Sequence, residues 1–166
     1  VWHEALDVSE FKLQSLKGSP KNINGDFLCL ANFLTSLKFG PEKVDGEFNC
    51  GHNKLLSLRF SPQKINGIFS CRENPDLKSL KGMPKEGITH MNVSDCDLSS
   101  LEGAPFEIDG NFDCQRNKNL KSLKGSPQEG VKSLYLQWCS LTSFEGAPKE
   151  ISGSVYAVQN PMTTLK

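Results

Sequence analysis

Apolar residues return along this chain in short alternating triplets, spaced by about 21 residues. Each triplet places an apolar side chain on either side of a variable one, as in Phe27-Leu28-Cys29 and Phe48-Asn49-Cys50. Alternation with a period of two is typical of a β-strand that buries one face. The pattern therefore predicts one short strand per repeat. The triplets after the first two are residues 69–71, 91–93, 112–114, 134–136 and 155–157.

A proline turn precedes each of these triplets at a constant interval. Most turns have the form of Leu16-Lys17-Gly18-Ser19-Pro20, in which glycine permits a tight bend and proline ends the pairing. The prolines of the seven turns, each 21 or 22 residues after the one before, are Pro20, Pro41, Pro62, Pro84, Pro105, Pro127 and Pro148. Such a period is typical of a solenoid, because each coil repeats one turn at one place.

The full repeat follows a known consensus. Residues 88–98 and 131–141 both fit L-x-x-L-x-L-x-x-N/C-x-L, and other coils replace the first apolar position by an Asn-Gly or Asp-Gly step. The sequence resembles the short, bacterial-type repeats of leucine-rich-repeat proteins, and its form looks like repeats of uncharacterised prokaryotic and phage proteins. The resemblance covers nearly all 166 residues.

This resemblance implies a fold that is α/β by convention but helix-poor. We expect a right-handed leucine-rich-repeat solenoid of about eight coils, with a parallel β-sheet on its concave side and turns or extended chain on its convex side. The family also implies that an Asn or Cys after each strand turns inward and that the asparagines satisfy backbone groups there. These residues are Asn32, Asn53, Asn74, Cys96, Asn117, Cys139 and Asn160.

We expect a single domain over residues 1–166, with a degenerate N-terminal coil at 1–19 and regular coils at 20–150. Residues 151–166 form a last, incomplete coil. That coil leaves an open sheet edge, so a further domain or self-association through this end is expected.

The six cysteines all fall at positions that should face the core, either at the end of a strand triplet or in place of the inward asparagine. Buried free thiols fit a reducing compartment, so we expect a cytoplasmic protein of a bacterium or an infected host cell. A disulfide among Cys29, Cys50 and Cys71 is the alternative. No apolar run approaches the ~20 residues of a membrane span.

Large aromatic residues gather at one end of the predicted concave face. The only two tyrosines, Tyr135 and Tyr156, take the same outward position in adjacent coils, and Trp138 is expected near the end of the strand that carries Tyr135. Tyr and Trp are enriched in binding hot spots. The alternative is that they cover the open end of the stack. The predicted partner-binding residues are Tyr135, Trp138, Tyr156, Gln137, Arg116, Asp113, Asp95 and Arg72.

The formal net charge is zero, with 19 basic and 19 acidic residues, but the pattern separates the signs. Acidic residues outnumber basic ones on the strand face, and lysines concentrate in the turns. An acidic concave face disfavours nucleic acid and favours a protein partner with a basic patch. The alternative is that these charges serve solubility.

The sequence contains no catalytic set and no phosphate-binding or zinc motif. His90 with Asp95 and Glu73 is the one weak candidate for a metal cluster. Arg72 with Glu73, and Arg116 with Asp113, are predicted to be ordinary surface ion pairs. We therefore expect a protein without enzymatic activity, cofactor or metal.

Three functions fit this description. The first is a protein-binding inhibitor or adaptor, in which a phage-type protein occludes a bacterial host defence protein with its concave face. The second is the substrate-recognition domain of a larger bacterial effector whose catalytic domain is absent. The third is a binder of nucleic acid or of a membrane surface through the convex lysines.

Overall fold

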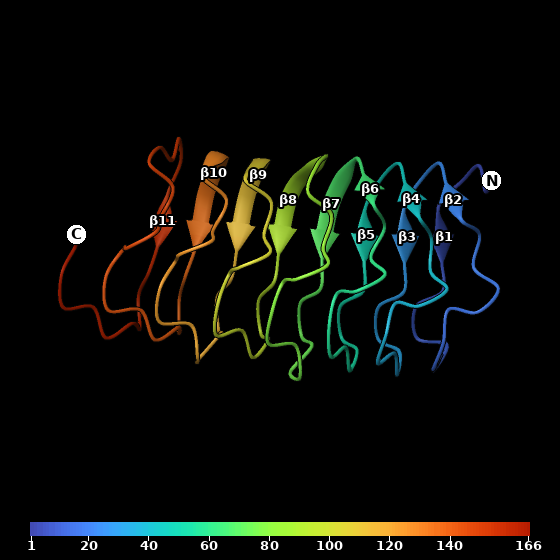
Figure 1. The fold of residues 1–166 in the computed structure, drawn as a ribbon, viewed down its shortest axis with the longest axis horizontal. Helices are drawn as coiled ribbons and strands as arrows, with labels where there is room; N and C mark the ends of the chain where they lie inside the picture. The colour runs from blue at the N-terminus through green and yellow to red at the C-terminus, as the bar shows by residue number, and fades with distance from the viewer.

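The computed structural model describes residues 1–166, and the chain winds through them as a solenoid whose coils lie side by side along one axis (Figure 1). No segment is helical. One parallel sheet of eight strands runs along the stack in the order β1-β3-β5-β7-β8-β9-β10-β11. Its strands are β1 (Leu6–Asp7), β3 (Phe27–Leu28), β5 (Phe48–Asn49), β7 (Gly67–Ser70), β8 (Ile88–Asn92), β9 (Glu107–Asp113), β10 (Glu129–Tyr135) and β11 (Val155–Tyr156). The predicted helix-poor solenoid with a parallel sheet is confirmed.

A second, smaller parallel sheet lies in the N-terminal coils and was not predicted. It consists of β2 (Asn22–Ile23), β4 (Lys43–Val44) and β6 (Lys64–Ile65). Trp2 extends it through an isolated parallel bridge to Ile23. In each of these coils the chain runs along one sheet, turns at the Asn-Gly or Asp-Gly step, and enters the other sheet in the opposite direction (Figure 1).

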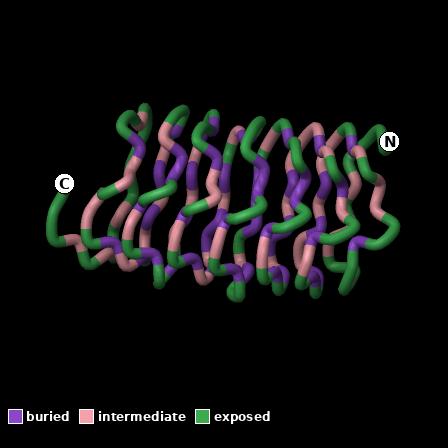
Figure 2. Tube along the Cα trace, in the orientation of Figure 1, coloured by how far each residue is buried: buried purple, intermediate pink, exposed green.

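The core is a continuous stack of equivalent side chains. Strand pairing places Phe27 beside Phe48 and Phe48 beside Phe69, and the ring centroids of both pairs are 5.9 Å apart. Met91 and Phe112 occupy the equivalent core position in the next two coils. The 33 buried apolar residues form one cluster, which follows the inner side of every regular coil (Figure 2). Each coil is therefore stabilised mainly by its two neighbours.

Buried asparagines hold the chain where each strand ends. The Asn53 amide nitrogen donates to the carbonyl oxygens of Cys29 at 3.0 Å, Cys50 at 3.2 Å and Gly51 at 3.0 Å. Its amide oxygen accepts from the backbone N–H of Leu34 at 3.0 Å. Each asparagine thus ties its own coil to the preceding one, and the predicted inward orientation is confirmed. The other buried members are Asn32, Asn74 and Asn117, and the partly exposed Asn160 makes equivalent contacts in the last coil.

All six cysteines are buried and free, as predicted, and none of them forms a disulfide. Cys96 and Cys139, which take the asparagine position, donate only weak thiol hydrogen bonds to the carbonyl oxygens of Cys71 and Cys114, at 3.4 and 3.3 Å. Burial raises the pKa of the Cys29 thiol to about 12, so this thiol stays protonated at neutral pH.

Two coils lack the Asn-Gly step and use a single glycine one position before the first apolar residue of the strand. Gly87 and Gly130 have φ of 78° and 72°. A β-carbon at either position would overlap the carbonyl oxygen of Ile65 or Ile108 in the preceding coil. Only glycine fits here, because the backbone is left-handed and two coils approach each other closely.

Candidate partner-binding surface

The residue before each inward Asn or Cys, and before Phe11 in the first coil, has a left-handed backbone, with φ between 50° and 61°. Because this conformation recurs in every coil, it belongs to the repeat. It brings one side chain per coil into a line along the end of the strands, which we call the edge row. Its members are Glu10, Ala31, His52, Glu73, Asp95, Arg116, Trp138 and Gln159.

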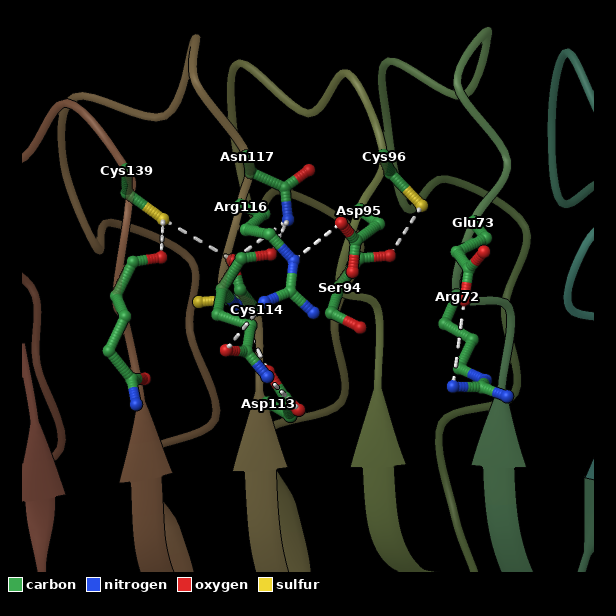
Figure 3. Close-up of polar contacts among 12 residues, drawn as sticks. Arg72, Glu73, Ser94, Asp95, Cys96, Asp113, Cys114, Arg116, Asn117 and Cys139 are labelled. Atoms are coloured by element: carbon green, nitrogen blue, oxygen red, sulfur yellow. Dashed lines mark hydrogen bonds and ion pairs between the residues drawn. The ribbon is translucent and has the colours of Figure 1, made fainter.

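Edge-row side chains pair with those of the neighbouring coil. Nε of Arg116 donates to Oδ1 of Asp95 at 2.6 Å, and the guanidinium lies 5.7 Å from the ring centroid of Trp138 (Figure 3 shows the Arg116–Asp95 pair). Further along the row, Nδ1 of His52 lies 2.8 Å from Oε2 of Glu73. Asp95, Arg116 and Trp138 therefore form a chain of contacts across three coils.

Two of the predicted polar groupings are wrong. Asp113 does not pair with Arg116; its carboxylate accepts from the backbone and side-chain nitrogens of Gln115 at 3.1 and 3.0 Å. Arg116 turns to Asp95 because the two residues occupy the same position in adjacent coils, where neighbouring strands lie about 4.8 Å apart. Partial burial raises the pKa of the Asp113 carboxyl.

The predicted cluster of His90, Asp95 and Glu73 is also not formed. Glu73 faces His52, Asp95 faces Arg116, and Nδ1 of His90 lies 3.4 Å from Oγ1 of Thr89. The predicted pair of Arg72 and Glu73 is present, with Nη1 and Oε1 3.6 Å apart.

The two tyrosines occupy equivalent positions, as predicted. Tyr135 of β10 pairs with Tyr156 of β11, and their rings stack with centroids 5.0 Å apart and planes 12° from parallel. The exposed fractions of Tyr156 and Trp138 are 45% and 47%. Trp138 does not lie on a strand, because β10 ends at Tyr135 and Trp138 follows in the left-handed bend. We call Tyr135, Trp138 and Tyr156 the aromatic patch.

Two further residues extend this region. Val158 is 64% exposed and hydrogen-bonds through its carbonyl oxygen to the backbone N–H of Trp138, so it adds apolar surface beside the patch that sequence reasoning left out of the site. Gln137, which was predicted as a site residue, has a buried side-chain oxygen without a hydrogen-bond partner. The surface around the aromatic patch thus combines exposed apolar area with a hydrogen-bond acceptor, the Gln137 side-chain oxygen, that has no donor.

Acidic residues without a cationic partner lie at the other end of the same face. Asp7, Glu10, Asp26 and Glu47 come from the coils of β1, β3 and β5, and none of them forms an ion pair. Asp26 instead accepts from the backbone N–H of Glu47 at 2.7 Å. The negative charge of the face is therefore concentrated in the N-terminal coils, away from the aromatic patch.

Comparison with known proteins identifies no relative, because no family model, curated protein or solved structure matches the chain. The structure also contains no helix that is long and apolar enough to cross a membrane. The geometry of the surface is thus the basis for a functional proposal.

Proposed function

We propose that this protein is a non-enzymatic binding module of the leucine-rich-repeat type, and that it binds a protein partner through the outer face of its eight-stranded sheet. The observation that carries the proposal is the aromatic patch, in which two stacked tyrosines and a half-exposed tryptophan lie on adjacent coils. Exposed aromatic residues of this kind form the centres of many protein interfaces.

The surroundings of the patch support its role as an anchor. Arg116 is fixed between Asp95 and Trp138, and the tyrosine rings fix each other, so little side-chain entropy is lost when a partner binds. Arg116, Asp95, Asp113 and Gln137 supply polar groups near the aromatic surface, whereas Arg72 lies three coils from Tyr135. This arrangement of an apolar centre and a polar rim is typical of protein interfaces.

The acidic N-terminal half of the sheet face indicates the charge of the partner. A partner with a basic patch is attracted to this half, which increases the rate of encounter, while the aromatic patch provides the affinity. A partner docked on this face has part of its own surface covered, which suits the role of an inhibitor or adaptor. The six reduced cysteines fit the cytoplasm of a bacterium or of an infected cell.

Replacement of Trp138 by alanine tests this proposal. We expect capture of a stoichiometric protein from bacterial lysate by the wild-type chain, and a loss of about 2 kcal/mol or more in binding, roughly 30-fold in Kd, for the variant. The melting temperature should remain nearly unchanged, because the ring lies outside the core. Isothermal titration calorimetry and differential scanning calorimetry measure the two quantities.

The control is the double variant Lys81→Glu/Lys85→Glu, which changes the charge of a turn away from the sheet face. It should bind the captured protein as the wild type does. If the lysine variant loses binding while Trp138→Ala retains it, the partner docks on the turns and the proposal is wrong. If Trp138→Ala unfolds the chain, the aromatic patch is a structural cap.

A further inference from the structure

The turn before each repeat proline has a position that requires a left-handed backbone. Glycine occupies it in five of the seven turns, with φ between 87° and 100°: Gly18, Gly82, Gly103, Gly125 and Gly146. The remaining two turns carry phenylalanine, and Phe39 and Phe60 have φ of 72° and 69°. A bulky residue in this conformation is a genuine outlier, and such outliers cluster at functional sites.

These two phenylalanines also face solvent, with an exposed fraction of 53% each. They lie in adjacent coils, so strain and apolar exposure occur together in one place. Neither residue contributes to the buried core. The fold therefore does not account for phenylalanine where glycine serves the other turns.

The N-terminal turns have room for these side chains. A β-carbon at Gly18 would have no atom within 4 Å, whereas at Gly82 or Gly103 it would come within 2.9 Å of the backbone of the preceding coil. Exposed aromatic side chains at this position are thus sterically compatible with the first turns and not with the later ones.

Positive charge is concentrated in the same turns. Residues 14–23, 35–44 and 56–65 together contain six cations and one anion, whereas the equivalent residues 78–88, 99–108, 121–131 and 142–151 contain six of each. At the position directly before the left-handed residue, the later turns alternate in charge, and Lys81 pairs with Glu102 and Lys124 with Glu145. The first three turns carry Lys17, Lys38 and Arg59 at this position, and none of them forms an ion pair.

A recess of about 490 Å³ lies at these turns. Phe39 and Phe60 both line it, and small residues such as Ser19 and Gly40 form other parts of its wall. We propose that this recess is a second docking surface, separate from the aromatic patch, which binds an acidic peptide segment of a protein. An apolar side chain of the peptide enters the recess, and its carboxylates contact Lys17, Lys38 and Arg59.

Two features favour a peptide over other anionic partners. Nζ of Lys38 lies 5.0 Å from the ring centroid of Phe39, and the Arg59 guanidinium lies 5.4 Å from that of Phe60, so one face of each ring is already occupied and not free to stack on a base. A recess of this size takes up a side chain, whereas a flat lipid surface leaves it unfilled.

The test uses random linear peptides displayed on phage, selected on the wild-type chain and counter-selected on the double variant Phe39→Gly/Phe60→Gly. Glycine is the residue of the other turns, so the double variant is expected to fold with a melting temperature close to that of the wild type. Selected peptides should carry an aromatic or aliphatic residue flanked by Asp or Glu. Their Kd, from fluorescence anisotropy, should rise about tenfold or more in the double variant.

Two further variants make the result specific. The triple variant Lys17→Ser/Lys38→Ser/Arg59→Ser should bind more weakly and with a smaller dependence on salt, and Trp138→Ala should bind the peptides as the wild type does. Equal binding of selected peptides to the double variant, or no enrichment at all, would overturn the proposal. Binding of phosphatidylserine vesicles or of polyuridylic acid that depends on the two phenylalanines, without binding of peptides, would also overturn the proposal. Such binding would identify a lipid surface or a nucleic acid as the occupant of the recess.

Discussion

Truncation of Phe48 to alanine is expected to lower the free energy of unfolding by about 3–5 kcal/mol, the usual cost for a buried phenylalanine. Phe48 is fully buried and stacks on Phe27 in one neighbouring coil and on Phe69 in the other. Its removal opens a cavity at two coil interfaces at once, and a solenoid has no distant contacts that compensate for weakened neighbours. Urea denaturation followed by circular dichroism measures the loss.

Phe106→Ala is the matched control for this variant. Phe106 is 63% exposed, so the same truncation should change the free energy of unfolding by no more than about 0.5 kcal/mol. Equal effects of the two variants would contradict the described stack of phenylalanines.

Replacement of Asn74 by alanine is expected to cost about 3 kcal/mol. Its amide nitrogen donates to the carbonyl oxygens of Cys50 and Cys71 at 3.1 and 2.8 Å, and its amide oxygen accepts from the N–H of Leu55 at 2.9 Å. Alanine makes none of these bonds and leaves buried backbone groups without partners. Thermal and urea unfolding measure the loss of stability.

The repeat itself supplies a graded control. Cysteine takes the same position in two coils, as Cys96 and Cys139, and each thiol makes weak contacts with two carbonyl oxygens there. Asn74→Cys should therefore be less destabilising than Asn74→Ala. Asn66→Ala, at an exposed side chain that hydrogen-bonds only to the side chain of Asp45, should have little effect. An unchanged stability of Asn74→Ala would contradict the inward asparagine ladder.

The sequence was sufficient to predict the main sheet, the inward asparagines and the buried cysteines. In a solenoid the spatial neighbours of a residue are the residues one period before and after it, so the period also gives the contacts. The prediction that Tyr135 and Tyr156 share a position required nothing more than this alignment, and the structure adds that their rings stack.

Features that depend on backbone conformation could not be predicted in the same way. The strands of the second sheet are only two residues long, as in Asn22–Ile23, and such a segment has no alternating pattern. The left-handed bend that moves Trp138 beyond β10 has no signature in residue type, since Glu73, Asp95 and Arg116 occupy the same position.

The ion pairs show how alignment by period could have been used further. Asp113 and Arg116 are close in sequence, but Asp95 and Arg116 occupy equivalent positions of adjacent coils, and the latter two pair. Glu102 and Glu145 likewise follow Lys81 and Lys124 by one period and pair with them. Charged residues of opposite sign at equivalent positions of adjacent coils therefore predict these ion pairs from the sequence.

Photo-crosslinking from the sheet face tests the central claim most directly. Tyr156 is replaced by p-benzoylphenylalanine, and Phe106, which is exposed on a turn, is replaced in the same way as the control. We predict that the protein captured from lysate is crosslinked through position 156 and not through position 106. A crosslink that forms only through position 106 would contradict binding at the aromatic patch.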